Sequence, residues 1–277
     1  MRCQICGAQV EDMVAACPEC GAKILPINVG SLKKLPEESR WYYILNRAMG
    51  FPGIKIDRCK FLRDKFSPRY DETTVANIIE EGTGRASVPP ALLDDIAAEV
   101  IKGHKLLATG ASAAAGLPGG FGLLATVPAD MAQYYFHSLQ LAQKLAYLYG
   151  YPDLEKNGKD DFLVSMTLFI GVMNDIGVAV KGVREFSKIL AEGGGYEVSR
   201  MAMTKGAIYP VVKQVARIMG VSVTKNLFAK SFSKIIPGIG ALASGGITLI
   251  MFSYEAERLR EGLREDFVAQ WRPEEEE

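Results

Sequence analysis

The sequence lacks an excess of charge of either sign. It carries 32 basic and 32 acidic residues among 277, with a formal net charge of zero and a pI near 6.8. Binding to the phosphate backbone of nucleic acid requires a surplus of lysine and arginine, so nucleic acid is excluded as a predicted partner. Strand-like alternation of apolar and polar residues is also scarce, and the predicted fold class is therefore all-α.

An apolar segment of the kind found in secretory signal peptides is missing after Met1. We therefore expect a cytoplasmic protein whose cysteines stay reduced. Four of its five cysteines form two Cys-x-x-Cys pairs, Cys3 with Cys6 and Cys17 with Cys20. Two such pairs provide the tetrahedral set of four thiolates that Zn²⁺ prefers in structural sites. The alternative is a pair of disulfides or free thiols, and it is the weaker interpretation, because a secreted disulfide module would normally follow a signal peptide.

Four thiolates leave the zinc ion no open coordination position, so we expect it to fold the amino-terminal module and to catalyse nothing. Each pair is followed by Gly-Ala, and this repeat resembles the short zinc ribbon of many bacterial membrane-associated and regulatory proteins. The module has few basic residues, Arg2 and Lys23, which favours a protein partner. The predicted organisation is a zinc ribbon over 1–25, a linker over 26–38, a helical domain over 39–270 and an acidic tail over 271–277.

Two long segments contain no charged residue: 24 residues over 106–129 and 20 residues over 235–254. Each is long enough to cross a bilayer as a helix, but both are rich in glycine and interrupted by a Pro-Gly step. Small residues at intervals of three or four let helices pack closely, in water or in lipid. We therefore predict two glycine-rich helical hairpins, which are either buried in the domain or inserted in a membrane.

Hydrophobic periodicity and capping residues predict the remaining helices. One helix begins at Asp57, and a short capped helix spans Asp71 to Gly82. A further helix starts at the Pro89-Pro90 step. The other predicted helices cover about 36–49, 122–148, 196–219, 221–234 and 239–268, with one or two more over 160–190.

The helix predicted over 122–148 carries a polar stripe, for which two interpretations are open. It is either a solvated face or a polar groove against the second glycine-rich segment. In the groove, Asp130 and His137 lie two turns apart on one side and are weak catalytic candidates, joined through a water, a metal or a ligand group. Asp130 is alternatively an N-cap, if the helix begins after residue 122. The stripe consists of Asp130, Gln133, His137, Gln140 and Lys144.

Three other residues have plainer predicted roles. His104 lies among lysines at a helix end, so we expect either exposure at the surface or a contact with the helix dipole. The fifth cysteine, Cys59, has no base nearby in the sequence and is expected in the core. Asp175 interrupts an apolar run. It is either a buried carboxylate paired with Lys181 or Arg184, or an exposed residue at a helix break.

Several motifs occur in an order that resembles the bacterial EcsC family. They are the runs Ala111 to Gly122, Val127 to Asp130, Gln143 to Pro152 and Ile236 to Gly246. The resemblance covers about residues 40–268. It implies a helical, membrane-associated protein from a family that is named for a gene beside an ABC-transporter operon and has no established catalytic activity.

These observations lead to three functional hypotheses. The first is a non-enzymatic regulatory or scaffold protein of bacterial type, linked to an ABC transporter and peripheral at the inner face of the membrane. Its ribbon docks a protein partner, and the segments 106–129 and 235–254 contact a membrane or a membrane protein. The second is a soluble helical protein that binds a lipid or another apolar ligand. The third, an enzyme using Asp130 and His137, lacks a nucleophile or a metal set.

Overall fold

The computed structural model describes residues 35–49, 52–108, 129–154, 159–191, 208–233 and 240–271. Over these residues the chain forms helices and no strands, which confirms the all-α class. The cysteines of the predicted zinc ribbon and the greater part of the first glycine-rich segment lie outside the described residues. The ribbon and the two glycine-rich hairpins therefore stay predictions.

The helices described in this part of the chain follow the predicted ones closely. Helices α3 and α4 begin after Asp57 and Asp71, whose carboxylates accept hydrogen bonds from the backbone N–H groups of Lys60 (2.8 Å) and Thr74 (3.0 Å). The helices are α2 (Glu37–Ala48), α3 (Arg58–Phe66), α4 (Glu72–Glu81), α5 (Pro90–Ala108), α7 (Ala129–Leu148), α8 (Lys159–Met173), α9 (Gly177–Ala191), α11 (Ile208–Ser233) and α12 (Gly240–Trp271).

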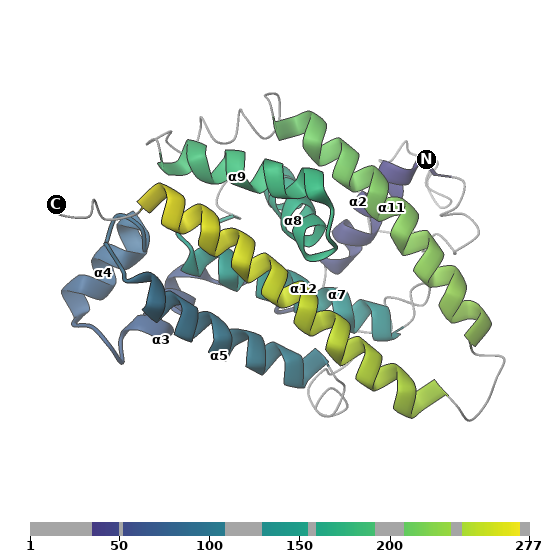
Figure 1. Cartoon of the computed structure of the whole chain (residues 1–277), viewed down its shortest axis with the longest axis horizontal. Helices are drawn as coiled ribbons and strands as arrows, with labels where there is room; N and C mark the ends of the chain where they lie inside the picture. Colours follow the sequence, from purple (N-terminus) through teal and green to yellow (C-terminus); the bar gives the residue numbers. More distant parts are fainter. Residues whose placement is uncertain are drawn as a thin grey trace, which may run out of the picture.

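The centre of the molecule is built from α7 and α8. Every residue of α8 from Phe162 to Met173 is buried, because the helix is apolar around its whole circumference. Its Thr167 hydroxyl donates to the carbonyl of Leu163 (2.7 Å) and accepts from the indole Nε1 of Trp41 on α2 (2.9 Å). Helices α2, α7, α9, α11 and α12 surround α8, and α12 crosses the molecule beside α5 (Figure 1).

Ion pairs fix how α5 and α12 lie against each other. The carboxylate of Asp94 on α5 accepts from Arg264 Nε (2.6 Å) and lies 3.5 Å from Arg260 NH1, both on α12. The Tyr149 hydroxyl, just after α7, donates to the same carboxylate (3.0 Å). The two helices are antiparallel (Figure 1), so the C-terminal end of α5 lies beside the N-terminal half of α12.

The predicted break near Gly220 is wrong, because α11 is one continuous helix from Ile208 to Ser233. Gly220 lies inside that helix at its crossing with α2. A Cβ atom there would come within 1.7 Å of the Glu37 carbonyl oxygen. The glycine therefore allows α2 and α11 to pack closely and does not end a helix.

The run predicted as one or two helices over 160–190 forms two, α8 and α9. Asp175 lies in the break between them with φ of +60°, a left-handed conformation that ends α8. Its carboxylate is exposed and lies 3.5 Å from Arg258 Nε. Of the two alternatives for Asp175, the exposed residue at a helix break is the one confirmed. Over the described residues, no helix combines the length and the hydropathy needed to cross a membrane.

Candidate functional site

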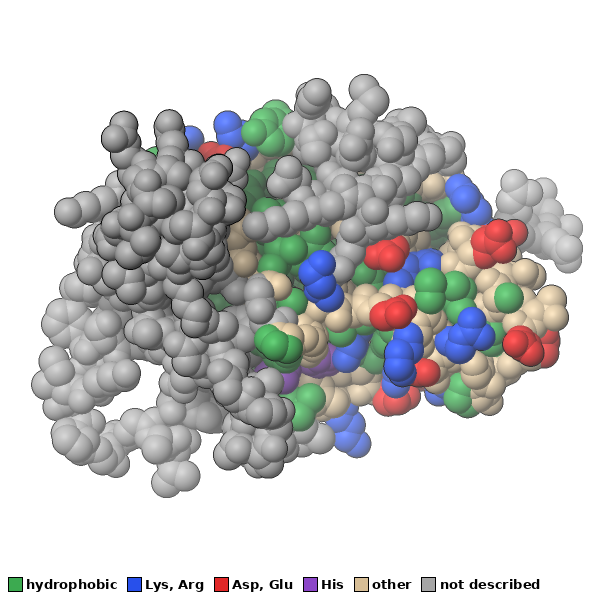
Figure 2. Space-filling view, turned by 180° about the vertical axis from the view of Figure 1, so that it is seen from behind, with side chains coloured by type: hydrophobic (Ala, Val, Ile, Leu, Met, Phe, Trp, Pro, Cys, Tyr) green, Lys and Arg blue, Asp and Glu red, His purple; other side chains and the backbone are tan. Residues whose placement is uncertain are grey.

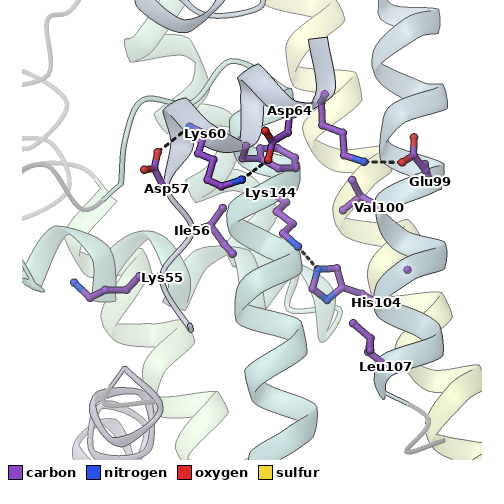
Figure 3. A pocket seen from close by; sticks show the side chains of 13 residues that line it. Lys55, Ile56, Asp57, Lys60, Asp64, Glu99, Val100, His104, Leu107 and Lys144 are labelled. Carbon is purple, nitrogen blue, oxygen red and sulfur yellow. Dashed lines mark hydrogen bonds and ion pairs between the residues drawn. The ribbon is translucent and has the colours of Figure 1, made fainter. Parts of the chain in front are cut away.

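One pocket of the described residues gathers several ionisable side chains. Its volume is about 640 Å³, inside the range of about 300 to 1,000 Å³ that is usual for small-molecule sites. The C-terminal halves of α5 and α7, helix α3 and the segment before α3 form its walls (Figure 3). We call it the lysine–histidine pocket and define it by Lys55, Lys60, Lys65, Lys144, His104 and Leu107.

Two glutamines of α7 hold the segment before α3 in place. Gln143 is fully buried, and its Nε2 donates to the carbonyl of Ile54 (2.8 Å) while its Oε1 accepts from the N–H of Ile56 (3.0 Å). Gln140 Nε2 donates to the carbonyl of Gly53. A buried amide that satisfies both its donor and its acceptor fixes the neighbouring backbone. This wall of the pocket is therefore positioned by side chains of α7.

Helix α5 presents one side to the pocket, because Val100, His104 and Leu107 are spaced by four and three residues. His104 is 3% exposed. Of the two alternatives for His104, exposure at the surface is wrong, because the side of α5 that carries it packs against α7. In the sequence, lysines lie on both sides of His104. The sequence of one helix does not show which of its faces another helix covers.

The Lys144 ammonium Nζ lies 2.9 Å from His104 Nε2 (Figure 3). An ammonium group has three N–H donors and no acceptor, so the histidine nitrogen must accept. The ring proton of His104 then sits on Nδ1, which is buried and has no hydrogen-bond partner among the described residues. Lys144 uses one donor in this contact.

Burial sets the ionisation of this cluster. It lowers the pKa of His104 to about 3, with smaller effects from Lys144 and His137. Burial and the Lys144 charge lower the pKa of His137 to about 4. Both imidazoles are therefore neutral at pH 7. The pKa of Lys144 is lowered by burial and, less, by the nearby Lys65 charge. Lys144 is thus half-buried, and the imidazoles of His104 and His137 beside it are neutral.

The carboxylates that line the pocket already have partners. Asp64 pairs with Lys60 (2.7 Å), and Glu99 pairs with Lys65 (2.6 Å). Asp57 caps α3. Among the described residues none of these three carboxylates is hydrogen-bonded to Lys144.

The structure changes the interpretation of the polar stripe on α7. His137 is 6% exposed and packs edge to face on His104, with ring centroids 5.7 Å apart. The solvated-face interpretation is therefore wrong for this histidine. Asp130 lies in the first turn of α7, and its side chain is outside the described residues. The proposed Asp130–His137 pair is thus untested, while His137 meets a second histidine that the sequence did not place beside it.

Two other site predictions can be compared with the structure. Cys59 is exposed on α3, so its predicted burial in the core is wrong. The buried residues of α3 are Arg58, Phe61, Leu62 and Phe66, and position 59 falls outside this stripe. No group of three histidine, cysteine or acidic side chains is arranged for a metal ion within the described ranges. The predicted zinc ligands Cys3, Cys6, Cys17 and Cys20 lie outside those ranges.

Exposed apolar side chains lie on the N-terminal half of α12. Ile250, Met251 and Tyr254 are 57%, 54% and 70% exposed, and Leu107 at the end of α5 is 42% exposed. The ion pairs of Asp94 set the register of α5 against α12. We call Ile250, Met251 and Tyr254 the apolar surface.

The opposite face from that of Figure 1 shows the surroundings of the histidines. Their exposed edge is small and is bordered by a basic side chain, and basic and acidic side chains alternate beside it (Figure 2). Comparison of the chain with known protein families, curated proteins and solved structures gives no match.

Proposed function

We propose that this protein is a membrane-associated regulatory or scaffold protein that binds the bilayer peripherally. The observation that carries the proposal is the apolar surface. Large side chains that are more than half exposed and neighbour one another on a helix mark an interaction site, because monomeric soluble proteins seldom expose contiguous apolar groups. Met251 and Tyr254 supply the apolar and amphipathic side chains that favour the membrane interface.

The position of this surface in the sequence supports a lipid contact over a purely protein contact. Ile250, Met251 and Tyr254 belong to the uncharged segment 235–254, and Leu107 belongs to the uncharged segment 106–129. The end of α5 and the N-terminal half of α12, which are described parts of these segments, lie at the same end of the molecule (Figure 1). Segments without charged residues are suited to the headgroup and acyl boundary.

Vesicle flotation tests the proposal. We expect the full-length chain to float with phospholipid vesicles, and a variant with Ile250, Met251 and Tyr254 each changed to serine to stay largely at the bottom of the gradient. The matched control is Ile218→Ser on α11, which removes an isoleucine of 41% exposure far from α5. Recovery of the wild-type chain in the lipid-free fractions with every vesicle composition would refute the proposal.

The remaining predicted features extend this proposal. The ribbon cysteines Cys3, Cys6, Cys17 and Cys20 would bind structural Zn²⁺ and present the ribbon to a protein partner. The EcsC-like motifs support a partner in the membrane, of which an ABC transporter is the example that the resemblance provides. No observation favours the soluble carrier of an apolar ligand or the enzyme using Asp130 and His137.

A further inference from the structure

Lys144 is held in the lysine–histidine pocket by a neutral partner. Its Nζ lies 2.9 Å from His104 Nε2 (Figure 3), and His104 is itself packed against His137. A nearby carboxylate favours the charged form of an amine, whereas a neutral imidazole supplies no opposite charge. Lys60 and Lys65 have such carboxylates, but among the described residues Lys144 has none. Lys144 therefore lacks the interaction that stabilises the charge of the other two lysines.

The surroundings of Lys144 also disfavour its charge. The side chain is half-buried, and Ile56, Phe61 and Val100 line the same pocket. Burial lowers the pKa of Lys144, and the charge of Lys65 on α3 lowers it further. Proteins use desolvated lysines that lie near a second cation as nucleophiles, because the neutral amine carries the reactive electron pair. The pocket thus shifts Lys144 toward its neutral amine.

A carbonyl compound is the class of ligand that reacts with a neutral amine. The amine nitrogen bonds to the carbonyl carbon, the C=O double bond becomes single, and the proton that the nitrogen releases ends on the oxygen. This carbinolamine loses its hydroxyl group as water, together with the second proton of the nitrogen, and leaves a C=N imine. No oxidant or reductant takes part. The product is a covalent but reversible link between the lysine and its ligand.

The size and the walls of the pocket restrict the carbonyl compound. A volume of about 640 Å³ holds a small molecule. Apolar side chains form part of the wall, and burial of apolar surface favours a ligand with an apolar or aromatic body. Aldehydes react with amines more readily than ketones do, because a hydrogen atom on the carbonyl carbon hinders the attack less than a second carbon group does.

We propose that the lysine–histidine pocket binds a small aldehyde with an apolar or aromatic body, which Lys144 holds covalently as an imine. This inference goes beyond the proposed membrane association and does not depend on it. A chain that fails to float with vesicles would refute the proposed function and leave the reaction of Lys144 to be measured by itself.

The experiment labels the folded full-length chain with benzaldehyde and cyanoborohydride, which reduces an imine and makes the benzyl label permanent. Peptide mass spectrometry at low conversion then measures the label on each lysine. We expect Lys144 to carry several times the label of Lys181, an exposed lysine of α9 outside the pocket. Accessibility alone predicts the opposite, because Lys144 is half-buried. Equal labelling, or more label on Lys181, would overturn the inference.

Formaldehyde separates a pocket for the ligand from a lysine that is merely reactive. It has no apolar body, so we expect the preference for Lys144 over Lys181 to be clearly larger with benzaldehyde. The same preference with both aldehydes would overturn the assignment of the pocket. In urea the two lysines should be labelled alike, and a preference that survives unfolding would mean that the fold plays no part and would overturn the inference.

A variant assigns the reaction to its residue. Lys144→Arg keeps the positive charge and a long side chain, but the guanidinium stays protonated and forms no imine. We expect this variant to lose the fast phase of benzaldehyde labelling, with the label on Lys181 unchanged. A fast phase that persists in the variant would overturn the assignment to Lys144. Circular dichroism establishes that the variant is folded; should it not fold, the comparison of Lys144 with Lys181 in the wild type decides the inference alone.

Discussion

The close contact between α2 and α11 at Gly220 predicts that one added carbon atom destabilises the protein. Gly220→Ala adds one methyl group at the crossing of these helices. The new Cβ would lie 1.7 Å from the Glu37 carbonyl oxygen and 2.5 Å from its carbonyl carbon. Both atoms belong to backbone in the first turn of α2, so no side-chain rotation can relieve the contact. The helices must separate, or α2 must shift along α11.

The size of the shift sets the expected loss of stability. A Cβ requires at least 3.0 Å from its neighbours, so the two backbones must move apart by more than 1 Å. Helix α2 packs Trp41, Ile44 and Leu45 into the core, all of them buried. Moving this helix would open space around those side chains. Overpacking of a core costs about 1 to 3 kcal/mol. Because the obstacle here is backbone, we expect Gly220→Ala to lower the free energy of unfolding by about 3 kcal/mol or more.

Urea unfolding of the full-length chain, followed by circular dichroism, measures this change. The matched control is Gly262→Ala in the interior of α12, where a Cβ would meet the nearest atom, Val172 Cγ1, at an ordinary 3.7 Å. Alanine is favoured over glycine inside a helix by about 1 kcal/mol, so this control should be more stable than the wild type. A Gly220→Ala protein as stable as the wild type would refute the close packing of α2 on α11.

Three further predictions follow from buried charge and from the metal site. Burial raises the pKa of Glu255 to about 8, so the folded chain keeps it protonated while the unfolded chain ionises near pH 4.5; stability falls as pH rises between these values. Glu255→Gln should thus raise the free energy of unfolding at pH 7 by about 3 kcal/mol and change it little at pH 4, as measured by urea unfolding at both pH values. Lys144→Met should leave the melting temperature unchanged or raise it, because it removes a charge whose burial is unfavourable; a marked fall would mean that the lysine is structural. Full-length protein should contain one Zn²⁺ by elemental analysis, and a chelator should remove it with loss of structure confined to the ribbon; a metal-free chain with unchanged circular dichroism would contradict the ribbon.

The helices that the sequence predicted best are those with local start or stop signals. Asp57, Asp71 and Gly82 mark helix ends through their own hydrogen bonds or backbone conformation, so neighbouring residues contain the information. Gly220 is also a glycine of the kind that ends helices, and it led to the wrong prediction that a helix ends there. Its role depends on the Glu37 carbonyl, which is distant in sequence. Local chemistry alone does not distinguish a glycine that ends a helix from one that lets another helix approach.

The candidate site was predicted less completely, for a related reason. The stripe on α7 included His137 and Lys144, but its periodicity did not show what lies opposite. The structure places His104 of α5 there, and two histidines that looked independent in the sequence form one buried cluster. Gln143 carried a weak signal, since it is a polar residue among Leu139, Ala142 and Ala146, which are all buried. Its role is clear only in the structure, where its side chain binds the backbone of Ile54 and Ile56.

The position of Lys144 is difficult to explain by folding alone. A lysine that is half-buried, bonded to a neutral histidine and lacking a carboxylate partner among the described residues opposes folding, and a hydrophobic residue would pack there more favourably. The pairs of Lys60 with Asp64 and of Lys65 with Glu99 show that acidic partners line the same pocket. Residues that break the rules of stable packing are most often those that serve a ligand.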